Sequence, residues 1–184
     1  MDHDIELKFQ KVKKSLEKDF GPGLDVPSLL FLIGVNELGI GYKDFSKQEK
    51  TELMHIAICT LLEPYGLAWL EEPLRTDSSM ADWQQLKAGA RIPLAAGENL
   101  IGATRFEQAS ESQAFGVLQP DIAKWGGISG CWPVIQTIRE SGARFCPHYL
   151  GAGIGLMASA HVLAAAGGDG VLEVDANDNL LRSL

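Results

Sequence analysis

Two hydrophobic patterns alternate along the chain from residue 46 onward. Short apolar runs typical of buried strands fall at 67–70, 92–96, 115–119, 143–146 and 171–174. Stretches with apolar residues at helical spacing precede or separate them, at about 46–63, 79–88, 104–112, 130–141 and 155–166. Ser46 and Glu49 match a capping box, which predicts where the first of these helices begins. Strands alternating with helices predict an α/β fold with a parallel sheet.

A polar, ionisable residue stands at or near the end of each predicted strand. These residues are Glu71, Glu98, Asp121, His148 and Glu173, at steps of 27, 23, 27 and 25 residues, each about one βα unit. In a (β/α) barrel, all such positions lie on one rim, where active sites form. A doubly wound open sheet also fits the alternation, but it would not gather five strand ends around one point. We therefore favour the barrel.

The first 45 residues are less regular. The stretch "IELKFQKVKKSLEKD" predicts a strand running into a helix, and "VPSLLFLIGVN" predicts a strand followed by a glycine-rich turn. We interpret residues 1–45 as two divergent early barrel units and residues 46–184 as the barrel units that carry the chemistry.

Composition and charge narrow the class of protein. The chain has 184 residues, 46% of them hydrophobic, and a formal net charge of −8. No basic cluster is interleaved with aromatic residues, which argues against nucleic acid and anionic membranes as partners. No run approaches the roughly 18 apolar residues of a membrane span, and the N-terminus lacks the apolar core of a secretory signal. Cys59, Cys131 and Cys146 are odd in number and lie in apolar surroundings, so we expect reduced thiols in a cytoplasmic protein.

Two pairs of strand-end residues suggest chemistry. Glu71 and Glu98 offer the hard oxygen ligands that Mg²⁺ prefers, although a lone strand-end glutamate more often makes a solvated salt bridge. Asp121 and His148 follow successive strands and can be neighbours. A carboxylate bonded to one ring nitrogen fixes the tautomer of a histidine and makes the other nitrogen a general base. The alternative for His148 is a structural histidine at the start of a loop.

Five motifs in the second part of the chain carry a family resemblance. The phrases "WLEEP", "AGENL", "QPDIAKWGGISG", "PHYLGAGIG" and "LEVDANDNLLR" occur in this order over about residues 67–184. Together they resemble the mandelate racemase branch of the enolase superfamily. The resemblance implies a partial TIM-type (β/α) barrel, corresponding to the C-terminal domain of that superfamily.

The resemblance also implies roles for the strand-end residues. Glu71 and Glu98 correspond to ligands of Mg²⁺, and His148 with Asp121 corresponds to the family's base dyad. Glu173 corresponds to the residue that donates a hydrogen bond to the substrate carboxylate as it becomes an enolate.

A further lysine and one branch-specific position complete the implied site. Lys124 matches a position common to the family, where it would be a supporting charge near Asp121. The related muconate-lactonizing branch carries a catalytic lysine where this chain has Asp121, which favours the racemase-like branch.

The implied activity is Mg²⁺-dependent removal of the proton next to a carboxylate. Most members of this branch dehydrate acid sugars (aldonates or aldarates) to 2-keto-3-deoxy acids. A racemase or epimerase of a 2-hydroxy acid begins with the same proton abstraction and is one alternative. An inactive truncated barrel that acts only as an oligomer partner is the other.

The chain departs from the family pattern at its start. The family's third metal ligand is an aspartate, and Gly34 occupies the corresponding position; Asp44, 27 residues before Glu71, is a weak substitute. Lys11 or Lys13 would correspond to an early catalytic lysine. The N-terminal α+β capping domain has no counterpart, so we expect a truncated barrel. Its open sheet edges favour a homo-oligomer.

Overall fold

The chain forms two compact units in a computed structural model that describes residues 3–39, 41, 43–177 and 180. The units are Met1–Leu61 and Leu62–Leu184, and the second carries the sheet and every strand-end residue considered above. None of the described helices combines the length and the apolar character needed to cross a bilayer.

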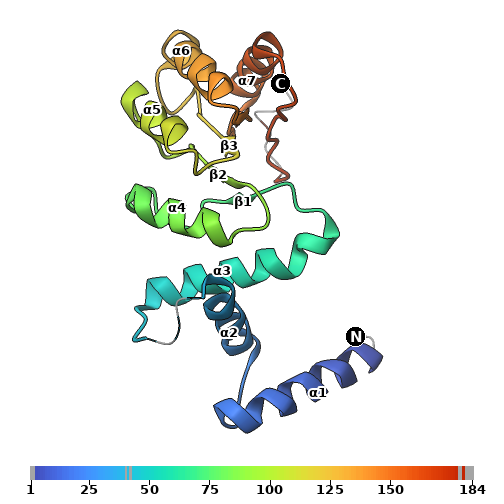
Figure 1. Cartoon of the computed structure of the whole chain (residues 1–184). Coiled ribbons are helices and arrows are strands. Elements are labelled where there is room, and N and C mark those ends of the chain that lie inside the picture. The colour runs from blue at the N-terminus through green and yellow to red at the C-terminus, as the bar shows by residue number, and fades with distance from the viewer. Residues whose placement is uncertain (1–2, 40, 42, 178–179, 181–184) are drawn as a thin grey trace. The chain divides into compact units, whose positions relative to one another are not determined.

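The second unit alternates strands and helices. Its elements are η1 (Glu63–Tyr65), β1 (Leu70–Glu71), α4 (Met80–Gly89), β2 (Leu94–Ala96), α5 (Ala103–Glu111), β3 (Val117–Leu118), α6 (Gly127–Glu140), β4 (Arg144–Phe145) and α7 (Gly153–Ala166). The four strands are parallel and pair in the order β1-β2-β3-β4. Helices α4 to α7 form an arc outside the strands (Figure 1). The α/β alternation and the parallel sheet are therefore confirmed, as a partial barrel with shorter strands than predicted.

The strand register defines an inner face of the sheet. Glu71 pairs with Ala95, and Ala95 pairs with Val117, so these three side chains form one row across β1, β2 and β3. Ala95 and Val117 are fully buried, and Trp69 packs against them. Because side chains alternate along a strand, Trp69 and Glu71 share this inner face.

An aromatic contact joins α4 to the segment that leads into β3. A capping box at Ser79 and Asp82 starts α4, since each residue's side chain accepts the other's backbone N–H. Trp83 of this helix is 3% exposed, and its ring lies 4.9 Å from that of Phe115, just before β3. Truncating such a buried aromatic costs about 3–5 kcal/mol, so this contact anchors α4 beside the strands.

The predicted strand at 171–174 is not formed. The Val171 N–H donates to the sulfur of Cys146, 3.5 Å away, instead of to a backbone carbonyl. A Cβ atom at Gly170 would overlap the carbonyl group of Phe145, so the chain passes close to β4 there. The segment therefore follows β4 without a ladder of backbone hydrogen bonds, which is what defines a strand.

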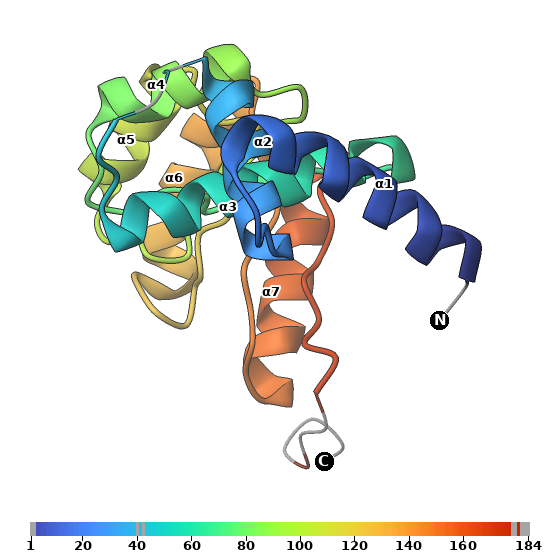
Figure 2. The same ribbon diagram turned by 90° about the horizontal axis from the view of Figure 1, so that it is seen from below.

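The first unit is helical, and both strands predicted in residues 1–45 are wrong. It contains α1 (His3–Phe20), α2 (Val26–Leu38) and most of α3 (Lys47–Leu62), and Figure 2 shows α1 and α2 joined by a short linker. The side chain of Asp25 caps α2 by accepting the Ser28 N–H, and Gly39 ends it in the left-handed conformation. The apolar run of α2 reads equally well as a buried strand, and only its length and caps favour a helix.

Gly34 lies in the middle of α2, where the family resemblance leads us to expect an aspartate at a strand end. It is buried against α3, and a Cβ atom at this position would overlap the carbonyl group of Leu53. Gly34 therefore permits close helix packing. The capping box predicted for α3 is confirmed by reciprocal hydrogen bonds between Ser46 and Glu49. The domain boundary predicted at residue 45 stays a prediction. The division into compact units falls elsewhere, after Leu61.

Candidate active site

Four predicted site residues project from the carboxyl ends of adjacent strands. Glu71 is the last residue of β1, Glu98 follows β2, Asp121 follows β3 and His148 follows β4. Because the strands are parallel and adjacent in this order, their carboxyl ends lie along one edge of the sheet.

His148 and Asp121 form a buried pair. The ring nitrogen Nδ1 of His148 lies 2.8 Å from Oδ2 of Asp121, and the side chains are only 4% and 5% exposed. The other oxygen of Asp121 accepts the backbone N–H groups of Ala123 at 2.7 Å and Lys124 at 3.1 Å. The turn after β3 thus fixes the carboxylate, and the carboxylate fixes the ring. Nε2 is left as the ring atom available for proton transfer.

The Nε2 atom of His148 faces two further carboxylates. It lies 2.6 Å from Oε2 of Glu98 and 3.7 Å from Oε2 of Glu173. A neutral imidazole carries only one N–H. A neutral ring with its N–H on Nδ1 donates to Asp121 and leaves a lone pair on Nε2, whereas an imidazolium can donate from both nitrogens. The arrangement can accept, hold and return a proton at Nε2.

Glu98 lies at the centre of a charged network. Its Oε2 also accepts a hydrogen bond from Lys124 Nζ at 2.8 Å, and its Oε1 accepts one from Asn99 at 3.1 Å. Burial raises the pKa of Glu98, but the hydrogen bond from Lys124 and the positive charges of His148 and Lys124 outweigh burial and lower it. The predicted supporting charge, Lys124, therefore contacts Glu98 directly.

Glu173 reaches the site from an irregular segment. Its Oε2 accepts the backbone N–H of Tyr149 at 3.1 Å, next to His148 in the chain. This hydrogen bond places the carboxylate beside the imidazole although residues 171–174 form no strand. Glu173 therefore lies with the predicted group even though the element predicted to hold it does not form.

Glu71 is held by two donors that sequence reasoning missed. Its Oε2 accepts hydrogen bonds from Trp69 Nε1 at 2.9 Å and from Gln119 Nε2 at 3.0 Å. Gln119 is 2% exposed and lies two residues before Asp121, at the end of β3. A polar residue between an apolar strand and "PD" was the available signal, since buried amides usually have a specific partner.

Two residues with unusual backbone conformations lie in the turns that follow β1 and β2. Gly97, between β2 and Glu98, has φ +143°, and a Cβ atom there would lie 2.5 Å from the backbone nitrogen of Gln119. Glu72 adopts φ +36°, unusual for a residue other than glycine, and its carboxylate accepts a hydrogen bond from Asn99. Strained backbone of this kind persists where the surrounding contacts determine it, and it is concentrated at functional sites.

Two strand-end carboxylates, those of Glu71 and Glu98, are the ligands that this site offers to a magnesium ion. Glu71 and Glu98 provide oxygen ligands from adjacent strand ends, and Mg²⁺ commonly binds through one or two carboxylates with water and substrate completing its shell. Among the described residues, no group of three or more His, Cys, Asp or Glu side chains is arranged to enclose a metal ion.

The alternative early ligands belong to the first unit. Gly34 lies within α2 and offers no side chain, and Asp44 is exposed in the segment before α3. Lys11 and Lys13 lie within α1, and Lys13 lies 3.9 Å from Glu17 one helical turn later. The strand end expected to carry the early lysine is therefore not formed.

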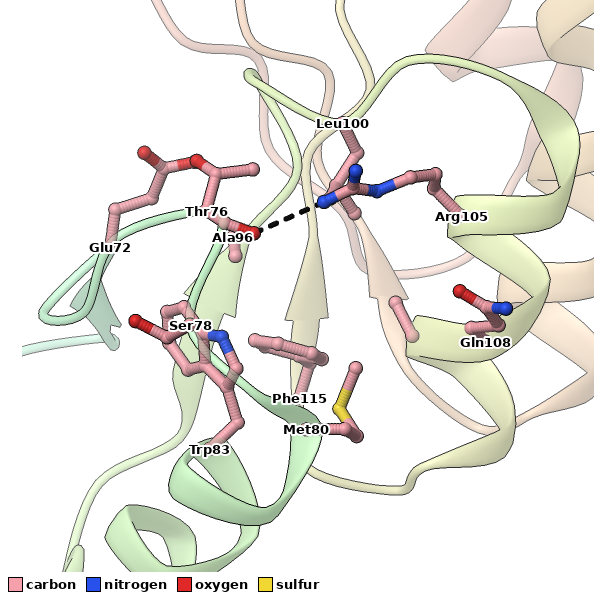
Figure 3. A pocket seen from close by; sticks show the side chains of 11 residues that line it. Glu72, Thr76, Ser78, Met80, Trp83, Ala96, Leu100, Arg105, Gln108 and Phe115 are labelled. Carbon is pink, nitrogen blue, oxygen red and sulfur yellow. Dashed lines mark hydrogen bonds between the residues drawn. The ribbon is translucent and has the colours of Figure 1, made fainter.

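A cavity of about 180 Å³ lies close to the site, on the outer side of the sheet. Figure 3 shows Trp83, Phe115 and Met80 along its wall, with Glu72 and Arg105 on opposite sides. Arg105 donates to the carbonyl oxygen of Thr76 at 3.2 Å. Neither the His148–Asp121 pair nor Glu98 lines this cavity, so it is separate from the candidate base.

The fold and site define a class: a parallel (β/α) barrel segment with acidic strand ends around a histidine–aspartate pair. The family model described as enolase C-terminal domain-like matches residues 44–183, and the chain belongs to this family. A crystal structure of a mandelate racemase/muconate lactonizing enzyme from Bordetella bronchiseptica is 44% identical, with a TM-score of 0.68. The similarity covers 88% of this chain and 46% of that one.

Two curated relatives are similar over a shorter region. A D-galactonate dehydratase from Klebsiella pneumoniae and a D-galactarolactone cycloisomerase from Agrobacterium fabrum are each 33% identical over 101 residues. The matched region is 55% of this chain and 26% of each relative. The matched region therefore spans only about a quarter of the length of these enzymes.

Proposed function

We propose that this chain takes part in Mg²⁺-dependent abstraction of the proton next to a carboxylate, with an acid sugar as substrate and dehydration as the outcome. The observation that carries the proposal is the buried His148–Asp121 pair, with 2.8 Å between Nδ1 and Oδ2, beside Glu98 at the strand ends. The names of the two curated relatives support acid-sugar chemistry, one as a dehydratase and one as a cycloisomerase.

His148 is the proposed base. Asp121 accepts a hydrogen bond from the Nδ1–H group and keeps Nε2 directed away from it, toward Glu98 and Glu173. To receive the substrate proton, Nε2 has to be free of its 2.6 Å contact with Glu98. General-base catalysis of this kind contributes about 10²–10⁴-fold to a rate.

The remaining side chains stabilise the charge that proton removal creates. Glu71 and Glu98 would hold Mg²⁺, which supplies positive charge where the substrate carboxylate becomes more negative. Glu173, when protonated, can donate a hydrogen bond to that carboxylate through the oxygen that does not accept from Tyr149. Lys124 contributes a further positive charge through its contact with Glu98.

Dehydration balances as a β-elimination. Nε2 of His148 takes the proton from the carbon next to the carboxylate, and the electron pair of that C–H bond forms a carbon–carbon double bond. The hydroxyl on the next carbon leaves, and the proton carried by His148 completes a water molecule. The resulting enol tautomerises to a 2-keto-3-deoxy acid.

Two alternatives depend on other observations. Racemisation or epimerisation of a 2-hydroxy acid begins with the same base and applies when no leaving hydroxyl is present. An inactive barrel that serves as an oligomer partner is favoured by Gly34, which packs within α2 and cannot be a ligand.

We also propose a homo-oligomer, since β1 and β4 are the outer strands of the described sheet. A cytoplasmic location fits the three free cysteines.

Isotope exchange distinguishes these functions. The chain is incubated with Mg²⁺ and a panel of sugar acids in D₂O, and NMR follows the proton next to the carboxylate. We expect exchange in the wild type, loss of at least 100-fold in His148→Asn, and no change in His161→Asn, which replaces an exposed histidine on α7. A 2-keto-3-deoxy product indicates dehydration, and a new stereoisomer indicates epimerisation. If no acid shows exchange and the chain binds no Mg²⁺, the inactive barrel is the function that the result supports.

A further inference from the structure

The side chain of Gln119 reaches Glu71 across an intervening strand. Gln119 follows β3 and Glu71 ends β1, and these strands lie on either side of β2, about 9–10 Å apart. Its amide nitrogen nevertheless lies 3.0 Å from Oε2 of Glu71. The inner-face residue of β2 between them is Ala95, whose methyl group leaves room for the contact.

The chemistry of the two groups determines which atoms meet. An ionised carboxylate only accepts hydrogen bonds, so the amide must present its NH₂ group and not its oxygen to Glu71. Trp69 donates to the same oxygen at 2.9 Å. Both donors therefore fall on Oε2 of Glu71, and Oε1 is the oxygen that they leave to face other partners.

Gln119 also contacts the turn that carries Glu98. Its backbone N–H donates to the Ala96 carbonyl at 2.9 Å, and the close approach of its backbone is what requires glycine at position 97. One residue thus fixes the turn before Glu98 through its main chain and the carboxylate of Glu71 through its side chain. Its 2% exposure is expected for a rigid support and not for a surface polar residue.

We propose that Gln119 is a positioning residue for the metal site, and that its amide, together with the Trp69 indole, orients Glu71 so that one oxygen faces the ion. This inference rests on the proposed function, because it takes Glu71 and Glu98 as the Mg²⁺ ligands. Residues that orient metal ligands typically change metal affinity by about 10–100-fold when they are replaced.

Direct metal binding by the full chain tests this role. Mn²⁺ binding is measured by electron paramagnetic resonance and Mg²⁺ by competition, without substrate, so activity does not enter. We expect Gln119→Met, which keeps the length of the side chain and removes the donor, to weaken binding by about 10–100-fold. Trp69→Phe, which keeps an aromatic ring against the core, should weaken it in the same direction. Gln84→Met is the matched control, since its amide donates to the Ser112 carbonyl on the surface.

Two further measurements separate positioning from a structural role. Urea unfolding of the metal-free variants reports stability, and a merely structural glutamine would change it without changing metal affinity. In a Glu71→Gln background, Gln119→Met should no longer alter the residual metal affinity, because its effect acts through Glu71.

The outcomes also separate this inference from the proposed function. One outcome overturns the positioning role and leaves the proposed function standing. In it the wild type binds metal, Glu98→Gln abolishes that binding, and the metal affinity of Gln119→Met is within twofold of wild type. Wild type that binds no metal at millimolar concentration overturns both. A weakening of 10-fold or more in Gln119→Met, with Gln84→Met unchanged, supports the inference.

Discussion

Replacing Gly97 by alanine tests how the turn before Glu98 is built. Gly97 has φ +143°, which side chains of L-residues rarely adopt, and its Cβ would lie 2.5 Å from the backbone nitrogen of Gln119. The contacted atom belongs to the backbone at the end of β3 and cannot rotate away. Two separate costs therefore apply, one from the backbone conformation and one from overlap.

The magnitude follows from those two costs. A residue in a sparsely populated backbone region costs about 1–3 kcal/mol, and overpacking a filled site costs about 1–3 kcal/mol more. We expect Gly97→Ala to lower the free energy of unfolding by about 2–6 kcal/mol, a large part of the 5–15 kcal/mol typical of a domain.

Two other glycines isolate the costs. Gly102 has φ +94° with open space around it, so Gly102→Ala should carry the backbone cost alone, about 1–3 kcal/mol. Gly130 lies within α6 with an ordinary φ and open space, so Gly130→Ala should stabilise the chain by about 0.5–1 kcal/mol.

The assay is urea unfolding followed by tryptophan fluorescence. All four tryptophans lie in the second unit, so the signal reports the unit that contains the site. Isotope exchange measured at low denaturant shows whether the folded fraction of Gly97→Ala retains the base geometry. A Gly97→Ala variant no less stable than Gly102→Ala would refute the close approach between the β2 and β3 ends.

Two other substitutions or treatments test the remaining structure. Gly34→Asp introduces the aspartate typical of the family. It should destabilise the α2–α3 packing by about 1–3 kcal/mol or more without strengthening Mn²⁺ binding, because the new side chain meets the Leu53 backbone. Circular dichroism follows the unfolding, and tighter metal binding would contradict this account. Burial raises the pKa of Cys131 to about 11, so its thiolate forms only as the pH approaches that value. At pH 8, iodoacetamide should label the partly exposed Cys59 first and leave Cys131 unlabelled until the chain unfolds, as mass spectrometry of the peptides will show. Equal labelling of Cys59 and Cys131 in the folded chain would contradict that burial.

The hydrophobic pattern predicted the second unit well because local and tertiary preferences agree there. Each apolar run is short, and α4 begins at the capping box formed by Ser79 and Asp82. The interval between strand ends then placed Asp121 and His148 on adjacent strands, and the structure brings them to 2.8 Å. Their catalytic roles stay predictions.

The pattern failed where it was ambiguous or where contacts replaced regular structure. The apolar run of α2 has no polar alternation, so its period does not distinguish a strand from a helix. Residues 171–174 have strand-like composition, but Gly170 and Val171 meet β4 through a close approach and a sulfur contact instead of a ladder.

The sequence by itself determined the order of β1 to β4 and of α4 to α7 and the positions of the acids that follow these strands, because both depend on local periodicity and turn chemistry. Only the tertiary structure decided that Gln119 and Trp69 share one oxygen of Glu71, and that Glu98 contacts both His148 and Lys124. Those contacts depend on strand register and on the small side chains between strands, which bring together residues as many as 48 positions apart.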